Sequence, residues 1–138
     1  QGDLFRSEWS MHPLLFLLGL SFLLAHEIDA ALNAEWRLLY VLRSLSDPTA
    51  SAAFVWVHVP LFVGLLWLAF LARPGVQRAT RAGLSSFLVI HAALHLRLSD
   101  HPLYGFAGWD SNGLILGAAL AGALYLLCEA IALRRRLA

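Results

Sequence analysis

The sequence predicts an all-α integral membrane protein, a four-helix bundle with a short interfacial helix after the first spanning helix. Of the 138 residues, 59% are hydrophobic and only 14% are charged, whereas soluble domains carry about 25% charged residues. Four apolar runs, residues 13–32, 53–72, 83–98 and 113–133, match the roughly 20 residues that cross a hydrocarbon core of about 30 Å. A soluble bundle is not expected, because so short a chain has too much surface to cover with so few charges.

The first apolar run, residues 13–32, follows Met11, where we expect the natural chain to start. Residues 1–10 are then either sequence added for expression or a short N-terminal extension, and residues 11–138 form a single transmembrane domain. After the run, residues 35–45 combine apolar residues such as Trp36, Leu39 and Leu42 with Arg37 and Arg43 in a pattern that suits a helix lying in the membrane interface. Asp47 and Pro48 then turn the chain into the second run.

The distribution of basic residues predicts the orientation of the bundle. The loop before the third run carries Arg73, Arg78 and Arg81 without an acid, and residues 134–136 are all arginine. The positive-inside rule therefore predicts that this loop and both termini lie on the cytoplasmic side of the membrane. A net charge of +1 gives no reason to expect a nucleic-acid partner, and the single cysteine, Cys128, excludes an internal disulfide or a thiolate cluster.

Histidines in the apolar runs are the strongest functional signal, because ionisable residues inside membrane segments are costly. If the runs alternate in direction, His26, His58, His91 and His95 all lie in the outer half of the bilayer, within about 10 Å of a helix end. His12 lies at the opposite edge, and Tyr125 and Glu129 also lie toward the cytoplasmic side. We expect none of these three to join the outer group.

Two local patterns resemble metal-binding helices. His91 and His95, spaced i and i+4, share one helix face, as in two-histidine metal sites. His26 and Glu27 begin an H-E-x-x-H-like pattern that fails at Ala30, so further ligands must come from other helices. Pro60 beside His58 removes a helical hydrogen bond and favours a polar pocket there.

Together these residues predict a metal site with His26, His58, His91 and His95 as ligands. Glu27 or Asp29 would be the general base or an additional ligand. Imidazoles with one or two carboxylates suit zinc or non-haem iron, and a bound metal would support hydrolytic chemistry. The alternative is structural, because buried histidines and carboxylates also join transmembrane helices through hydrogen bonds. Glu35, Asp100, His101 and Asp110 are expected to be solvated or capping residues.

From Met11 onward the chain resembles a small uncharacterised bacterial family of four-helix membrane proteins with an HEIDA-type motif in the first helix. Four blocks carry the resemblance in order: LLGLSFLLAHEIDAALNAEWRLL, HVPLF, FLVIHAALH and HPLYGF…GW. A looser similarity links it to membrane proteins with an H-x-x-E-E motif, in which Asp29 matches and Ala30 does not. The resemblance implies a polytopic protein of the bacterial inner membrane and contains the same histidines, but it adds no substrate.

Three functions are compatible with these patterns. The leading hypothesis is a metal-binding membrane protein, a metal-dependent hydrolase or oxidoreductase acting on a lipid or other apolar substrate near the outer leaflet. The second is a haem b redox protein, with two histidines such as His58 and His95 as axial ligands. The third is a non-catalytic accessory subunit of a membrane complex. The lipid bilayer is the expected partner, alongside a homo-oligomer or a larger membrane complex. Transport is not favoured, because no repeat or broken helix pair is found.

Overall fold

A computed structural model describes residues 11–137 as four α-helices joined by short helical turns, with no strand among those residues. The helices are α1 (Met11–Leu32), α2 (Asp47–Leu66), α3 (Pro74–Leu98) and α4 (Trp109–Leu137). The turns are the 3-10 turns η1 (Glu35–Arg37) and η2 (Leu42–Ser44) and the π-helical turn η3 (Trp67–Leu71). The predicted fold class is confirmed, whereas the prediction for residues 1–10 falls outside the described residues.

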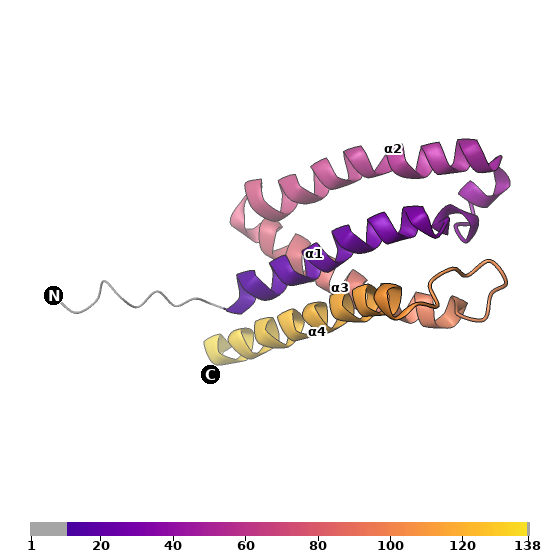
Figure 1. The fold of residues 1–138 in the computed structure, drawn as a ribbon. Helices are drawn as coiled ribbons and strands as arrows, with labels where there is room; N and C mark the ends of the chain where they lie inside the picture. Colours follow the sequence, from indigo (N-terminus) through magenta and orange to yellow (C-terminus); the bar gives the residue numbers. More distant parts are fainter. Residues whose placement is uncertain (1–10, 138) are drawn as a thin grey trace.

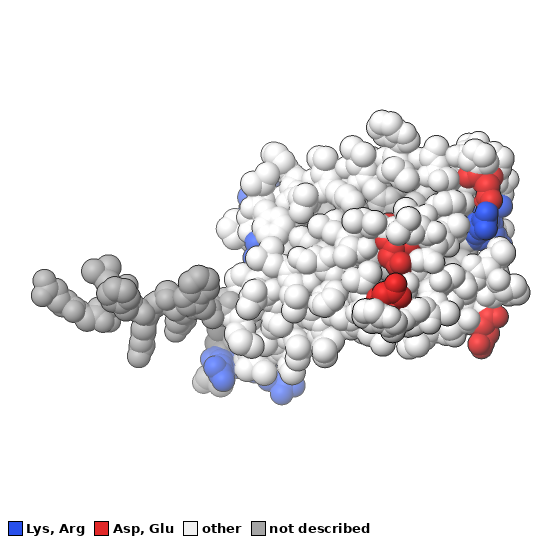
Figure 2. Space-filling model, viewed as in Figure 1, with Lys and Arg blue, Asp and Glu red and all other residues white. Residues whose placement is uncertain are grey.

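Three segments are long and apolar enough to cross a membrane: Met11–Leu32, Asp47–Leu71 and Trp109–Arg135. Their outer faces carry large apolar side chains, such as Trp56 and Val63, which are 72% and 65% exposed. α3 is more polar because its first turns carry Gln77, Arg78 and Arg81. Figure 2 shows that most of one face is uncharged, with charges near the two ends and an acidic group between them. This surface is suited to a lipid environment.

The four helices run up and down the bundle, so that the α1–α2 and α3–α4 connections share one end (Figure 1). The start of α1, the α2–α3 turn and the end of α4 lie at the other end. α4 packs along both α1 and α3, whereas α1 and α2 touch only lightly. The close approach of α3 and α4 depends on Gly122, where a Cβ atom would lie 2.6 Å from the Ser85 carbonyl oxygen. Small residues at such crossings are typical of membrane helix pairs.

The α1–α2 connection is less regular than predicted. Residues 35–45 form the two turns η1 and η2 instead of one continuous interfacial helix. The reason lies at the end of α1, where Ala34 has φ 53° and ψ 45°. This left-handed conformation ends helices, and the Asn33 amide supports it by donating to the Asp29 carbonyl at 2.9 Å. The chain therefore turns back over the end of α1.

The basic loop predicted before the third apolar run is mostly helical. α3 begins at Pro74, nine residues earlier than expected, with proline in the first turn where its missing N–H costs nothing. This extension brings Gln77 and Arg81 against the turn η3. Gln77 donates to the carbonyls of Phe70 and Ala72 at 3.0 and 2.7 Å. Arg81 donates to the Ala69 carbonyl at 3.0 Å, so α3 supplies the donors that the end of α2 needs.

Candidate metal centre

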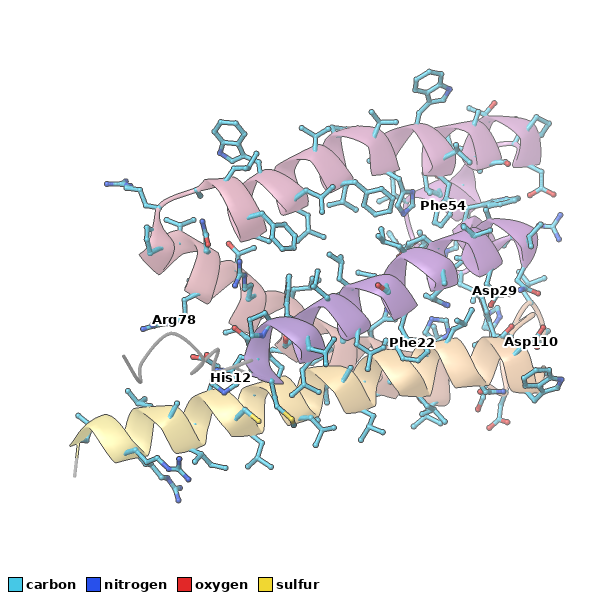
Figure 3. All side chains as sticks on the ribbon, turned by 60° about the vertical axis from the view of Figure 1, so that its left-hand side comes forward. His12, Phe22, Asp29, Phe54, Arg78 and Asp110 are labelled. Atoms are coloured by element: carbon cyan, nitrogen blue, oxygen red, sulfur yellow. The ribbon has the colours of Figure 1, made fainter. Side chains whose placement is uncertain are left out.

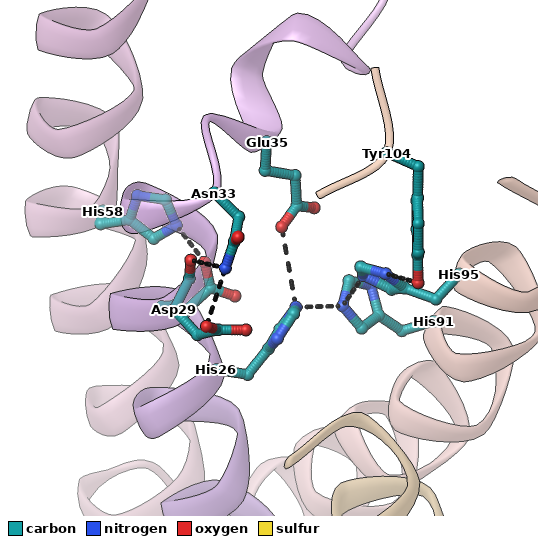
Figure 4. Close-up of polar contacts among 9 residues, drawn as sticks. His26, Asp29, Asn33, Glu35, His58, His91, His95 and Tyr104 are labelled. Carbon is teal, nitrogen blue, oxygen red and sulfur yellow. Dashed lines mark hydrogen bonds and ion pairs between the residues drawn. The ribbon is translucent and has the colours of Figure 1, made fainter. Parts of the chain in front are cut away.

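Four side chains from three elements converge near the end of the bundle that holds the α1–α2 and α3–α4 connections, which we call the connected end (Figure 4). They are His26 of α1, Glu35 of η1, and His91 and His95 of α3. One ligand atom from each lies within 4.8 Å of every other. We refer to these four residues as the His/Glu cluster.

Three of the distances between the ligand atoms are close to those expected around a tetrahedral metal ion. His91 Nε2 lies 3.0 Å from His26 Nε2 and 3.1 Å from His95 Nε2. Glu35 Oε2 lies 3.6 Å from His26 Nε2. Ligand atoms about 2.05 Å from a tetrahedral zinc ion lie about 3.3 Å apart. The observed distances fall on both sides of that value, so small movements would place an ion between the four atoms.

Local structure explains how each member reaches the cluster. His91 and His95 are one turn apart on the same face of α3, as their spacing predicts. His26 is 1% exposed on the inner face of α1. Glu35 follows directly after the left-handed residue Ala34, which reverses the chain and points the carboxylate back toward His26.

The α3–α4 loop supports the cluster from outside. The hydroxyl of Tyr104 lies 3.2 Å from His95 Nδ1. If Nδ1–H donates to this hydroxyl, the lone pair of His95 Nε2 faces the cluster, which is the tautomer that a metal ligand needs. The buried ring of Phe106 packs edge-on against His95 and at a tilt against His26, with centroids 4.9 and 5.6 Å away. This contact fixes the ring orientations and keeps water away from one side.

His58, the fourth predicted ligand, lies outside the cluster. Its Nε2 atom lies 2.8 Å from Glu27 Oε2, and its Nδ1 atom donates to the Phe54 carbonyl at 2.6 Å. Asp29 also lies apart and accepts a hydrogen bond from the Asn33 amide at 2.8 Å. The structure thus unites three of the predicted histidines and forms a separate pair from Glu27 and His58.

Two residues of the site were not found by sequence reasoning. Glu35 was expected to be solvated, yet its side chain is only 13% exposed. Tyr104 was not considered at all, although it belongs to the HPLYGF block that supports the family resemblance. The left-handed turn at Ala34 removes Glu35 from any helical periodicity, so spacing alone could not place it on the face of His26.

The electrostatic environment of Glu35 favours a bound proton or a bound cation. Burial, together with the nearby carboxylates of Glu27 and Asp29, raises the pKa of this carboxyl from its ordinary value of 4.5 to about 7. Burial and the neighbouring Glu35 carboxylate also raise the pKa of the Tyr104 hydroxyl. Glu35 Oε2 is buried without a hydrogen-bond partner. Such orphaned atoms are costly, and a divalent cation would satisfy this one.

A cavity of about 380 Å³ adjoins the cluster. Its polar wall consists of Glu27, Glu35, His58, His91 and His95, so the Glu27–His58 pair faces the same space as the cluster. The rest of its lining is leucine, valine and phenylalanine from α2, α3 and the η1–η2 segment. Ligand sites typically have this composition, with a few polar groups in a largely apolar pocket of about 300–1,000 Å³.

The polar residues that were predicted to lie toward the cytoplasm are separate from the His/Glu cluster. His12 Nδ1 lies 3.4 Å from Glu129 Oε1, and the buried Tyr125 packs against Phe16 in a different hydrophobic cluster. In Figure 3, His12 and Arg78 lie at one end of the bundle, whereas Asp29 and Phe54 lie toward the other. These residues stay apart from the His/Glu cluster, as expected.

The fold and the cluster define a helical protein with membrane-type helices and a histidine–carboxylate group compatible with metal binding. The chain belongs to a family of unknown function, DUF6713, whose model matches residues 12–132. This match agrees with the resemblance to an uncharacterised family noted above. Neither a curated protein nor a solved structure matched the chain.

Proposed function

We propose that this protein is a membrane-embedded metalloenzyme that hydrolyses an apolar substrate. His26, His91, His95 and Glu35 hold a divalent metal, and zinc is the first choice because three imidazoles and one carboxylate suit it. One observation carries the proposal: three imidazole Nε2 atoms and an orphaned buried carboxylate oxygen surround one point beside an apolar cavity. Interhelical hydrogen bonding alone would not leave Glu35 Oε2 without a partner.

The Glu27–His58 pair is the acid–base group of this proposal. Glu27 lines the cavity, whereas Asp29 does not, so Glu27 is the better candidate for the general base. His58 orients the Glu27 carboxylate through the contact of 2.8 Å. Catalytic zinc sites keep one position open beside their protein ligands, so a bound metal that left one position to water would supply a polarised carbonyl and a more acidic water. Glu27 would then accept a proton from the attacking water and pass it to the leaving group.

The location follows from the ends of the bundle. The cluster lies at the end that holds the α1–α2 and α3–α4 connections, opposite the α2–α3 turn with its arginines. The positive-inside rule favours the cytoplasm for that turn. These observations support our proposal that the site lies in the outer leaflet of a bacterial inner membrane, with both termini in the cytoplasm.

Metal analysis by mass spectrometry on detergent-purified protein tests the proposal. We expect about one equivalent of zinc per chain in the wild type, and its loss in His91→Ala/His95→Ala, because two of the four ligands are removed. His12→Ala is the matched control, since His12 pairs with Glu129 at the other end of the bundle. This variant should keep its metal.

Three results would contradict the proposal. Absence of metal from a folded wild type, with the double variant equally stable, would leave the histidines as helix-packing groups. A Soret band in an absorbance scan of the same sample would instead show that haem is bound. Stoichiometric co-purification of a partner, with full function after His91→Ala, would favour the accessory-subunit hypothesis.

A further inference from the structure

The cavity beside the His/Glu cluster extends along the helices toward the middle of the bundle. Leu61 lies one turn beyond His58 on α2, and Phe87 lies one turn before His91 on α3. Because α2 and α3 run in opposite directions, both apolar residues lie on the side of the histidines that faces away from the connected end. A ligand whose polar group meets the cluster would therefore direct an apolar part toward the bilayer midplane.

The cavity is covered at the connected end and open at its side. Leu38, Leu39 and Leu42 of the η1–η2 segment cover it from the end that faces the membrane interface. Val57 and Leu61 of α2 line the cavity, yet they are 53% and 55% exposed on the molecular surface. Phe87 of α3 is likewise 43% exposed. The gap between α2 and α3 therefore opens the cavity to the lipid chains around the protein.

The charged side chains that line the cavity favour a ligand whose polar group is uncharged. Its lining contains two carboxylates, Glu27 and Glu35, and no lysine or arginine among the residues that the structure describes. A phosphate group would meet acidic side chains there without a cationic partner other than the metal itself. An uncharged ester or amide would meet no such repulsion.

We infer that the occupant of this cavity is a neutral acyl lipid, which enters sideways between α2 and α3 and presents its ester or amide carbonyl to the His/Glu cluster. The inference rests on the proposed function and names its substrate class. In the reaction, a bond forms between the water oxygen and the carbonyl carbon, and the bond from that carbon to the ester oxygen or amide nitrogen breaks. The water proton taken by Glu27 moves to the leaving atom, so no oxidant or reductant is needed.

Photo-crosslinking in lipid nanodiscs tests the inference. The probe is a monoacylglycerol with a diazirine at the middle of its chain, added to the full chain in phosphatidylcholine nanodiscs. We expect crosslinks on the segments 57–61 and 87–94, which line the cavity. Val57→Trp should lower their yield several-fold because the larger ring occupies the side opening. Val55→Trp is the matched control, because Val55 is also 53% exposed but does not line the cavity.

Zinc content is measured on the same samples to separate the two proposals. If the wild type and both variants contain zinc, two crosslinking results would overturn the lipid inference but not the metalloenzyme proposal. One is equal crosslinking in both variants, and the other is crosslinks spread over outward positions such as Val63. Cavity crosslinks without zinc would overturn the metalloenzyme and, with it, the assignment of this lipid as a substrate. A second probe, with the same diazirine acyl chain on a phosphate-bearing head group, should crosslink less than the monoacylglycerol. Equal labelling by the two probes would overturn the preference for a neutral head group.

Discussion

The two ends of the bundle treat buried polar groups in opposite ways. At the end with the α2–α3 turn, Arg81 and Gln77 donate to the carbonyls that the turn η3 leaves free. The Arg81 guanidinium also lies over the rings of Phe16 and Phe70, at 5.5 and 5.3 Å from their centroids. These polar side chains complete the helix ends and stabilise the fold.

At the connected end, buried polar atoms lack partners. His26 Nδ1, Asp29 Oδ2 and Glu35 Oε2 are buried without a hydrogen bond, although Ala30 of α1 and Ala92 of α3 belong to a buried hydrophobic cluster at this end. Unsatisfied groups in a membrane protein are expensive and mark functional positions. We therefore associate stability with one end and propose ligand binding at the other. Three substitutions and one change of pH test this difference.

The largest effect is expected from Glu35→Gln. The substitution keeps the shape of the side chain but removes the only carboxylate in the cluster, so zinc affinity should fall about a hundredfold, or about 2.7 kcal/mol. Competition with a chromogenic zinc chelator measures this change. Glu129→Gln, at the other end beside His12, is the control and should bind zinc as the wild type does. Unchanged affinity in Glu35→Gln would show that the three imidazoles bind the metal without Glu35.

Arg81→Met is expected to act on stability and not on the metal. It removes a charged donor from the Ala69 carbonyl while keeping an apolar side chain, so the free energy of unfolding should fall by about 1.5–3 kcal/mol. Unfolding in mixed detergent micelles measures this loss, with Arg97→Met as the control because Arg97 is exposed. A loss of zinc in folded Arg81→Met protein would show that the two ends are coupled.

Much of the stable end could be predicted from sequence, because membrane helices depend on composition and length. The end of α1 at Leu32 and that of α3 at Leu98 agree with the predicted apolar runs. The start of α3 did not follow from hydropathy. Its first turns are polar because Gln77 and Arg81 bond to carbonyls of another segment, and this is a tertiary interaction that composition does not reveal.

The binding end was predictable only where helical geometry determines contacts. The spacing of His91 and His95, and the depth shared with His26, correctly indicated that these three residues could meet. Depth alone, however, did not distinguish His58, which has the same depth but pairs with Glu27. Glu35 was missed because its position depends on one left-handed residue, Ala34, and alanine has no special preference for that conformation.

Tyr104→Phe tests how far the α3–α4 loop contributes to binding. The hydroxyl lies 3.2 Å from His95 Nδ1 and, as the acceptor of Nδ1–H, would leave Nε2 free to bind a metal. Loss of such a partner typically lowers metal affinity about tenfold or more. The same chelator competition measures the change, and Tyr40→Phe is the control because Tyr40 is 80% exposed. Equal affinities in the two variants would mean that packing by Phe106 alone orients His95.

The smallest effect on zinc affinity is expected from a change of pH, which tests the contribution of the Glu35 carboxyl separately from the histidines. Metal binding needs the carboxylate form, and burial raises the pKa of Glu35 to about 7. Lowering the pH from about 7.5 to about 6.5 should therefore reduce the ionised fraction, and with it zinc affinity, about threefold.

His26, Glu27, Asp29 and Tyr104 also surround this carboxyl, and imidazole protonation adds its own pH dependence. We therefore compare the wild type with Glu35→Gln, in which only the contribution of Glu35 is removed. If the ratio of their affinities stays constant over this range, the Glu35 carboxyl does not titrate on metal binding, and the orphaned oxygen belongs to the packing of the bundle.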